Sequence, residues 1–213
     1  NMKILNQNGE IMSEESKINR APRLAIIAGA TGTGKSTLAH MVAHELDFSR
    51  CVSTDTIREV LRCNIGINES PALHRSSYSK GETGDPVNDW LDASEAVEKG
   101  VDAVIDRARA QGVDLVIEGV HVIPKSSWLR DWREAGGRAI GIVATADAEN
   151  QHREFIMKRE ESTYRGSSRY VLAFDRIRAI QRAIMERGRV AGWVRIDPLL
   201  HDDPLLRIRQ NLE

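Results

Sequence analysis

A glycine-rich loop with the residue types and spacing to hold phosphate occupies residues 29–37, which read GATGTGKST. It fits the pattern G-x-x-x-x-G-K-[ST], in which backbone N–H groups curl around an anion without obstruction from side chains. Lys35 would reach the β- and γ-phosphates of ATP, and the hydroxyl of Ser36 would bind Mg²⁺. A helix starting there would direct the positive end of its dipole at the same charge. We expect contacts to the nucleotide from Gly29, Thr31, Gly32, Thr33, Gly34, Lys35, Ser36 and Thr37.

A chance glycine-rich turn is the alternative interpretation of this loop. The motif requires a strand before it and a helix after it. Residues 24–28 form an apolar run rich in β-branched side chains, and residues 38–43 have a helical rhythm. Both parts of the context are present, so the sequence favours a phosphate-binding loop.

Two carboxylates follow predicted strands. Asp55 comes just after residues 51–53, and Glu118 comes directly after residues 115–117. Ligands of an open parallel sheet bind at the carboxyl ends of its strands. We expect Asp55 to be the catalytic base that accepts the proton of an attacking hydroxyl, in contact with substrate, and Glu118 to lie on the metal and substrate side. A helix N-cap is the structural alternative for Asp55.

Three further side chains are candidates for binding an acidic substrate. Arg58 would share a helix face with Asp55, where its guanidinium could fork onto a phosphate or carboxylate, but an ion pair with a neighbouring glutamate is an equal alternative. His121 lies just past a strand end and could donate to substrate, although a lone histidine is more often structural. Arg75, in the segment HRSSY, could cap an anionic group.

An arginine-rich stretch covers residues 152–189, where ten lysines and arginines stand against five aspartates and glutamates. Phosphoryl transfer needs cations around the oxygens of the transferred group, and a segment that closes over the nucleotide often supplies them. We expect Arg153 to contact the nucleotide, Arg159 to act in catalysis and Arg165 to contact substrate, all three as lid residues. The later arginines are expected to form a solvated helix face.

Strands and helices alternate along the chain from about Arg23. The sequence predicts strands at 24–28, 51–53, 115–117, 139–143 and 193–196, and helices at 35–47, 55–63, 97–111, 126–135, 147–161 and 170–190, with one more helix after Pro198. Residues 64–86 are expected to be a long loop or a broken helical insert, and 162–168 a loop. This order predicts an α/β fold, a mostly parallel sheet with helices on both faces. We expect a flexible leader at 1–22 and a single domain at 23–213.

Composition restricts the class of protein further. A chain of 213 residues, 41% hydrophobic and 29% charged, is typical of a globular protein of one domain. The formal net charge of -1 gives the chain no strong positive electrostatic potential that would attract nucleic acid, so a nucleic-acid partner is disfavoured. Without a long apolar stretch or a signal segment, the sequence predicts a cytoplasmic protein with no membrane partner. Cys51 and Cys63 are too few for a disulfide framework or a zinc cluster. Nothing in the sequence indicates an oligomeric state.

Several segments together resemble one protein family more specifically than the phosphate-binding loop does alone. Besides GATGTGKST they are STDTIREVLR (53–62), LHRSSY (73–78), IEGVHVIP (117–124), HREFIMKREES (152–162) and RYVLAFDRIRAIQ (169–181). Together they resemble the 2-phosphoglycerate kinase family, over about residues 24–197. The phosphate-binding loop is shared by a very large superfamily, whereas IEGVH followed by IP, and Ser-Thr-Asp before an Ile-Arg-Glu helix, are much more specific.

The resemblance implies an ATP- and Mg²⁺-dependent kinase acting on a hydroxyl of a small acidic or phosphorylated molecule, which is 2-phosphoglycerate for the namesake. It also implies a five-stranded sheet of order 2-3-1-4-5, and the residues on matching motif positions are Lys35, Ser36, Asp55, Arg58, Glu118 and the lid arginines. Longer family members carry an extra N-terminal domain, and only about twenty polar residues precede the first strand here. A kinase for a nucleoside, polynucleotide or antibiotic hydroxyl would keep these motifs. A nucleotide-dependent switch or binding module is the alternative of another class.

Overall fold

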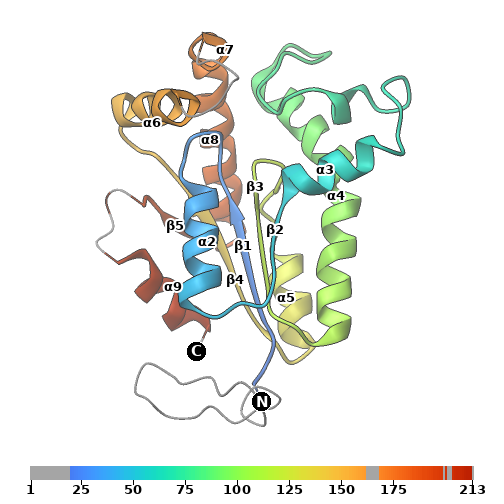
Figure 1. Ribbon diagram of the computed structural model, residues 1–213, viewed down its shortest axis with the longest axis vertical. Helices are drawn as coiled ribbons and strands as arrows, with labels where there is room; N and C mark the ends of the chain where they lie inside the picture. The colour runs from blue at the N-terminus through green and yellow to red at the C-terminus, as the bar shows by residue number, and fades with distance from the viewer. Residues whose placement is uncertain (1–19, 162–167, 199, 201–202, 213) are drawn as a thin grey trace.

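A parallel five-stranded sheet forms the centre of the computed structural model, which describes residues 20–161, 168–198, 200 and 203–212 (Figure 1). The strands are β1 (Arg23–Ala28), β2 (Cys51–Ser53), β3 (Leu115–Gly119), β4 (Arg138–Ala144) and β5 (Val194–Ile196). Their order is β2-β3-β1-β4-β5, and every pairing is parallel. This confirms the predicted α/β class and the order 2-3-1-4-5 that the resemblance implied.

Helices cover both faces of the sheet (Figure 1). One face carries α2 (Lys35–Glu45) and α9 (Pro204–Leu212), and the other carries α4 (Pro86–Gln111), α5 (Ser127–Glu134) and α8 (Phe174–Val190). Along β1, Leu24 and Ile26 join one apolar cluster, and Ala25 and Ile27 join the other. Because successive side chains of a strand point to opposite faces, this one strand supplies both cores and is buried throughout.

The long helix α4 begins and ends where side-chain chemistry predicts. The Asp85 carboxylate accepts hydrogen bonds from the N–H groups of Val87 and Asn88, and Pro86 stands at the first helical position. Gly112 ends the helix with a φ of 62°, the left-handed conformation that glycine adopts most easily. The predicted end is therefore confirmed, but the helix starts well before the predicted residue 97.

The structure divides one predicted helix and confirms the predicted loop or broken insert at 64–86. The helix predicted at 170–190 is divided into α7 (Ser168–Leu172) and α8, because Ala173 leaves the helical region with φ −97° and ψ 4°. The insert at 64–86 contains one short 3₁₀ helix, η1 (Pro71–His74), among turns. Most of the predicted loop at 162–168 lies outside the described residues.

Polar contacts hold the second half of this insert against α4 and α8. The carboxylate of Asp89, which is fully buried on α4, accepts hydrogen bonds from Gly81, from Thr83 and from the Arg176 guanidinium. Arg176 also donates to backbone carbonyls of the insert, those of Tyr78, Ser79 and Gly84. Burial raises the pKa of Asp89, but the hydrogen bonds lower it more, so the group is a carboxylate.

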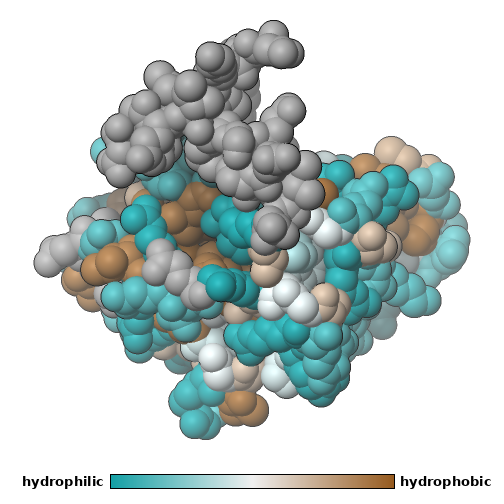
Figure 2. Space-filling view, turned by 90° about the horizontal axis from the view of Figure 1, so that it is seen from below, coloured by the Kyte–Doolittle hydropathy of each residue, from teal (hydrophilic) through white to brown (hydrophobic). Residues whose placement is uncertain are grey.

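A buried ion pair between Arg23 and Asp114 lies at the opposite end of the sheet, where the strands begin. The backbone N–H of Arg23 donates to Asp114 across 2.7 Å, and its guanidinium donates to the same carboxylate across 2.6 and 3.0 Å. Seen from this end, the described surface is mostly hydrophilic, with smaller apolar groups among the polar ones (Figure 2). None of the described helices has the length and apolarity to cross a membrane.

Candidate active site

The glycine-rich loop lies between the end of β1 and the start of α2, at the edge where all five strands end (Figure 1). Gly32 and Gly34 have φ angles of 82° and 76°, so the chain there takes a left-handed path that other residues adopt only with strain. A Cβ atom on Gly29 would lie 2.6 Å from the Thr33 hydroxyl, which donates to the Ala30 carbonyl. The loop therefore has the close backbone curvature of an anion cradle.

Ser36 and Glu118 meet beside this loop. The Ser36 hydroxyl donates to Oε1 of Glu118 across 3.1 Å, and Oε2 of Glu118 is buried with no hydrogen-bond partner among the described residues. In the sheet register Glu118 pairs with Ile27 of β1 and with Ser53 of β2, which places it between those strand ends. A hydroxyl and a carboxylate with an unused oxygen are ligands that suit Mg²⁺, so these residues fit the metal that the motif predicts.

Asp55 stands in the first turn of α3 (Thr54–Arg62), directly after β2. Its side chain is 70% exposed at the edge of the sheet that carries the loop. The N-cap is Ser53, whose hydroxyl accepts a hydrogen bond from the N–H of Thr56 across 3.1 Å. Ser53, and not Asp55, therefore caps the helix, and the carboxylate of Asp55 is exposed.

His121 lies beneath Asp55 and is almost fully buried. Its Nδ1 is 3.2 Å from the Thr54 hydroxyl and 3.6 Å from Oδ1 of Asp55, whereas its Nε2 has no hydrogen-bond partner in the described part of the chain. Burial lowers the pKa of His121 to about 4, and Arg58 and Lys35 add to this effect against the attraction of Asp55. The ring is therefore neutral near pH 7, with Nδ1 within hydrogen-bond distance of the Thr54 hydroxyl and close to Asp55 without a hydrogen bond to it.

Two arginines predicted to bind substrate donate hydrogen bonds to backbone carbonyls. Arg58 donates from Nε to the Leu73 carbonyl across 2.8 Å and from Nη2 to the Arg75 carbonyl across 3.0 Å. It also forms the alternative ion pair, with Glu59 at 3.1 Å. Arg75 donates to the Asp89 carbonyl across 2.7 Å. These contacts join the insert to α3 and α4, and substrate roles for the two arginines remain predictions.

The predicted lid residue Arg153 lies on α6 (Glu149–Glu161). The guanidinium carbon of Arg153 lies 4.1 Å from the ring centroid of Phe174, and its Nη2 is 3.4 Å from Glu149. Arg159 belongs to the same helix. Arg165 lies outside the described residues.

His152, on the same helix, was not identified from the sequence although it touches the loop directly. Its Nε2 is 2.8 Å from the Thr31 carbonyl oxygen. The sequence does indicate that His152 lies on the inner face of this helix, because it precedes the lid candidate Arg153 and stands one helical turn before the apolar Ile156.

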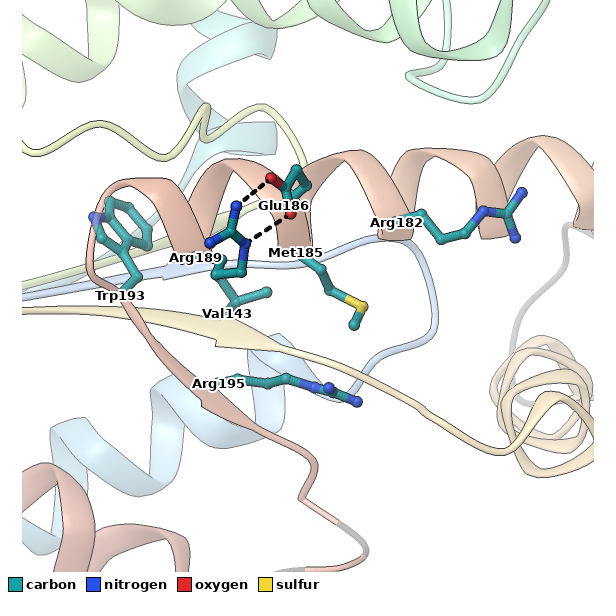
Figure 3. Close-up of a pocket in the computed structure, with 7 residues that line it drawn as sticks. All are labelled: Val143, Arg182, Met185, Glu186, Arg189, Trp193 and Arg195. Carbon is teal, nitrogen blue, oxygen red and sulfur yellow. Dashed lines mark hydrogen bonds and ion pairs between the residues drawn. The ribbon is translucent and has the colours of Figure 1, made fainter.

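A separate cavity of about 320 Å³ opens between α8 and the strands β4 and β5 (Figure 3). Arg189 is turned onto Glu186, and the side chain of Arg195 projects from β5. The lining residues are Val143, Arg182, Met185, Glu186, Arg189, Trp193 and Arg195. None of them is a predicted site residue.

Comparison with known proteins supports the likeness that the motifs carry. The 2-phosphoglycerate kinase of Methanothermobacter thermautotrophicus is 33% identical over 184 residues, and that of Thermococcus kodakarensis is 34% identical over 181 residues. Each alignment covers 81% of this chain and 60% of the relative. The chain thus spans about 60% of the length of these curated relatives.

Solved structures agree with the fold. A protein from Chloroflexus aurantiacus superposes with a TM-score of 0.53 at 19% identity, covering 91% of this chain and 100% of the other. Shikimate kinase from Acinetobacter baumannii superposes with a TM-score of 0.51 at 11% identity, covering 92% of both chains. The profile of the family described as Zeta toxin matches residues 9–191. This match, which contains the phosphate-binding loop, both strand-end carboxylates and α6, shows that the chain belongs to the Zeta toxin family.

Proposed function

We propose that the chain is a kinase that transfers a phosphoryl group from ATP, with Mg²⁺, to a hydroxyl of a small acidic or phosphorylated molecule resembling 2-phosphoglycerate. We assign this activity to residues 23–213 as one domain, and the cytoplasmic location remains a prediction. The observation that carries the proposal is the contact between Ser36 and Glu118 beside the glycine-rich loop, where one carboxylate oxygen of Glu118 has no hydrogen-bond partner among the described residues. A loop that merely turned the chain would not need a buried carboxylate at this point.

The residues around the loop divide the work of phosphoryl transfer. The backbone of the loop and Lys35 would hold the phosphates, and Ser36 and Glu118 would hold Mg²⁺. Bound Mg²⁺ supplies positive charge that offsets the charge developing on the transferred group. Asp55 would accept the proton of the acceptor hydroxyl at a carboxylate oxygen, next to the neutral ring of His121.

The names of the curated relatives support the choice of acceptor. Two 2-phosphoglycerate kinases share a third of their aligned residues with this chain. An acidic acceptor also requires cations, and the sequence offers arginines in the insert and in α6 for this purpose. Arg153, Arg159 and Arg165 remain our candidates for the lid, with Arg159 as the catalytic one.

The decisive experiment measures ADP release from ATP and Mg²⁺ by the purified chain. Potential acceptors are 2-phosphoglycerate, 3-phosphoglycerate, other hydroxy acids and nucleosides, and the Lys35→Ala variant serves as the inactive control. We expect 2-phosphoglycerate to stimulate ADP release selectively. Stimulation by a nucleoside alone would move the chain to the alternative substrate class, and turnover that no acceptor alters would indicate a nucleotide-dependent switch.

A further inference from the structure

Helix α6 is attached to the glycine-rich loop by one hydrogen bond. Nε2 of His152 lies 2.8 Å from the carbonyl oxygen of Thr31, although 121 residues separate the two along the chain. The His152 side chain is fully buried. A lid helix and the phosphate-binding loop are thus in direct polar contact.

The partners of His152 determine which nitrogen carries the proton. A carbonyl oxygen only accepts, so Nε2 must be the donor. Nδ1 faces Nη1 of Arg178 at 3.4 Å, and a guanidinium only donates, so Nδ1 is the acceptor. Burial lowers the pKa of His152, which favours this neutral form. Arg178 itself donates to the carbonyls of Ala146 and Asp147 at the entry to α6.

The contact with Thr31 has a consequence for the next amide of the loop. The carbonyl of Thr31 and the N–H of Gly32 belong to one planar trans peptide, in which the two groups point in opposite directions. By holding the carbonyl on the side of α6, His152 directs the Gly32 N–H away from α6. A loop that cradles phosphate depends on N–H groups held in a fixed direction.

The packing around Gly32 keeps this peptide in place. A Cβ atom on Gly32 would lie 2.4 Å from Cγ1 of Ile156 and 3.2 Å from Nε2 of His152. Because His152 and Ile156 stand four residues apart, one face of α6 lies against the backbone of Gly32. The φ angle of 82° at Gly32 adds to the requirement for glycine.

From this geometry we infer that His152 is a positioning residue for nucleotide binding, which aims the Gly32 N–H at a phosphate of ATP by holding the Thr31 carbonyl. The inference rests on the proposed function, because it assigns ATP to the loop. It adds a role for α6 that does not depend on arginine. The lid helix prepares the loop for the nucleotide.

The test compares two amides that reproduce different nitrogens of the ring. In His152→Gln the side-chain NH₂ reaches the position of Nε2, so the bond to Thr31 is kept. In His152→Asn the NH₂ stops one methylene short, near the position of Nδ1, so that bond is lost. His44→Gln is the matched control, because His44 is 86% exposed on the far part of α2.

The measurement is equilibrium binding of ATP with Mg²⁺ by calorimetry, using the full chain without an acceptor. We expect His152→Asn to bind ATP about 10-fold more weakly than the wild type, the loss expected for one buried hydrogen bond, and His152→Gln to stay within about threefold. His44→Gln should bind like the wild type. Hydrogen exchange of the Gly32 amide without nucleotide should be faster in His152→Asn and unchanged in His152→Gln.

Two failures are distinguishable. Failure of the wild type to bind ATP would overturn the proposed kinase function and the role of His152 with it. Tight binding by the wild type and equally tight binding by His152→Asn would overturn only the role of His152. The same holds if His152→Gln and His152→Asn weaken binding alike, because that result points to general packing of α6. Thermal unfolding of both variants shows whether either fails to fold. If His152→Asn does not fold, exchange of the Gly32 amide in the folded His152→Gln is the test. A rate equal to that of the wild type supports the role of His152, and a faster rate overturns it.

Discussion

Ser36 and Glu118 are joined by a 3.1 Å hydrogen bond across 82 residues of sequence, and that contact links the glycine-rich loop to the carboxylate on β3. Ser36 belongs to the helix that follows β1, and Glu118 belongs to the neighbouring strand β3. The pairing exists because β3 lies next to β1 in the sheet, in register so that Glu118 stands opposite Ile27. The candidate metal site therefore depends on the order of the strands.

Replacing Glu118 by glutamine tests this site. The amide keeps the shape of the side chain but removes its charge, so Mg²⁺ binding should weaken. We expect the Mg²⁺ concentration for half-maximal ADP release to rise about 10- to 100-fold, as for other changes at metal sites. The control is Glu45→Gln, at an exposed position of α2. An unchanged Mg²⁺ dependence in Glu118→Gln would remove Glu118 from the metal site.

The role of Asp55 is tested by Asp55→Asn. If the carboxylate accepts the proton of the acceptor hydroxyl, kcat should fall by about 10²- to 10⁴-fold while ATP affinity stays constant. The matched control is Asp106→Asn, where an exposed carboxylate pairs with Arg109. Activity near that of the wild type would show that Asp55 is not a base and that positioning alone is sufficient, as a loose transition state allows.

The substitution Arg58→Lys keeps the positive charge of the side chain but removes the planar, forked shape of the guanidinium. The guanidinium of Arg58 serves two carbonyls at once, those of Leu73 and Arg75, and a lysine ammonium does not reproduce that fork. We expect Arg58→Lys to raise the KM for the acceptor at least threefold and to make the insert cleave faster in limited proteolysis.

The control for Arg58→Lys is Arg109→Lys, which changes an arginine that pairs with Asp106 on α4, away from the insert. The opposite result for Arg58→Lys, normal KM and normal proteolysis, would show that the fork of Arg58 onto the two carbonyls is not needed to position the insert.

Much of the fold could be predicted because its signals are local. The apolar run of β1 and the glycines that end helices act within a few residues, so most elements were located to within a few residues. The start of α4 was missed because the valines we counted begin at Val97, whereas the buried Trp90 and Ala93 extend the packed face toward Pro86. The break at Ala173 has no glycine or proline to mark it.

The candidate site was only partly predictable for a similar reason. The loop, Asp55 and Glu118 follow from the rule that ligands bind at strand ends, which needs only the order of elements. The engagements of Arg58 and Arg75 depend on where the insert folds back, and the sequence does not encode that locally. His152 contacts a backbone carbonyl, a partner that every residue offers, so its place one helical turn before Ile156 indicates an inward face but not what the ring binds.

The buried ring of His121 predicts how stability depends on pH. The folded chain has a pKa of about 4 at His121, and burial is the main cause, while the unfolded chain has an ordinary histidine value of 6.5. Below pH 6.5 the unfolded chain binds a proton that the folded chain does not, so acid favours unfolding. The free energy of unfolding should fall by about 3 kcal/mol between pH 6.5 and pH 4 through this group. His152, whose pKa is also lowered by burial, acts in the same direction.

Denaturant unfolding from pH 7 to pH 4 measures this effect, with His121→Phe as the comparison. Carboxylates such as Asp89 contribute to acid unfolding in both proteins, so the difference between the two curves isolates the histidine. We expect the wild type to lose stability more steeply than His121→Phe below pH 6.5, so that any advantage it has at pH 7 shrinks toward pH 4. Parallel curves would show that the ring takes up a proton in the folded chain as readily as in the unfolded one. In that case a charged imidazole would stand beside Asp55, and the neutral ring that we assign to His121 would be wrong.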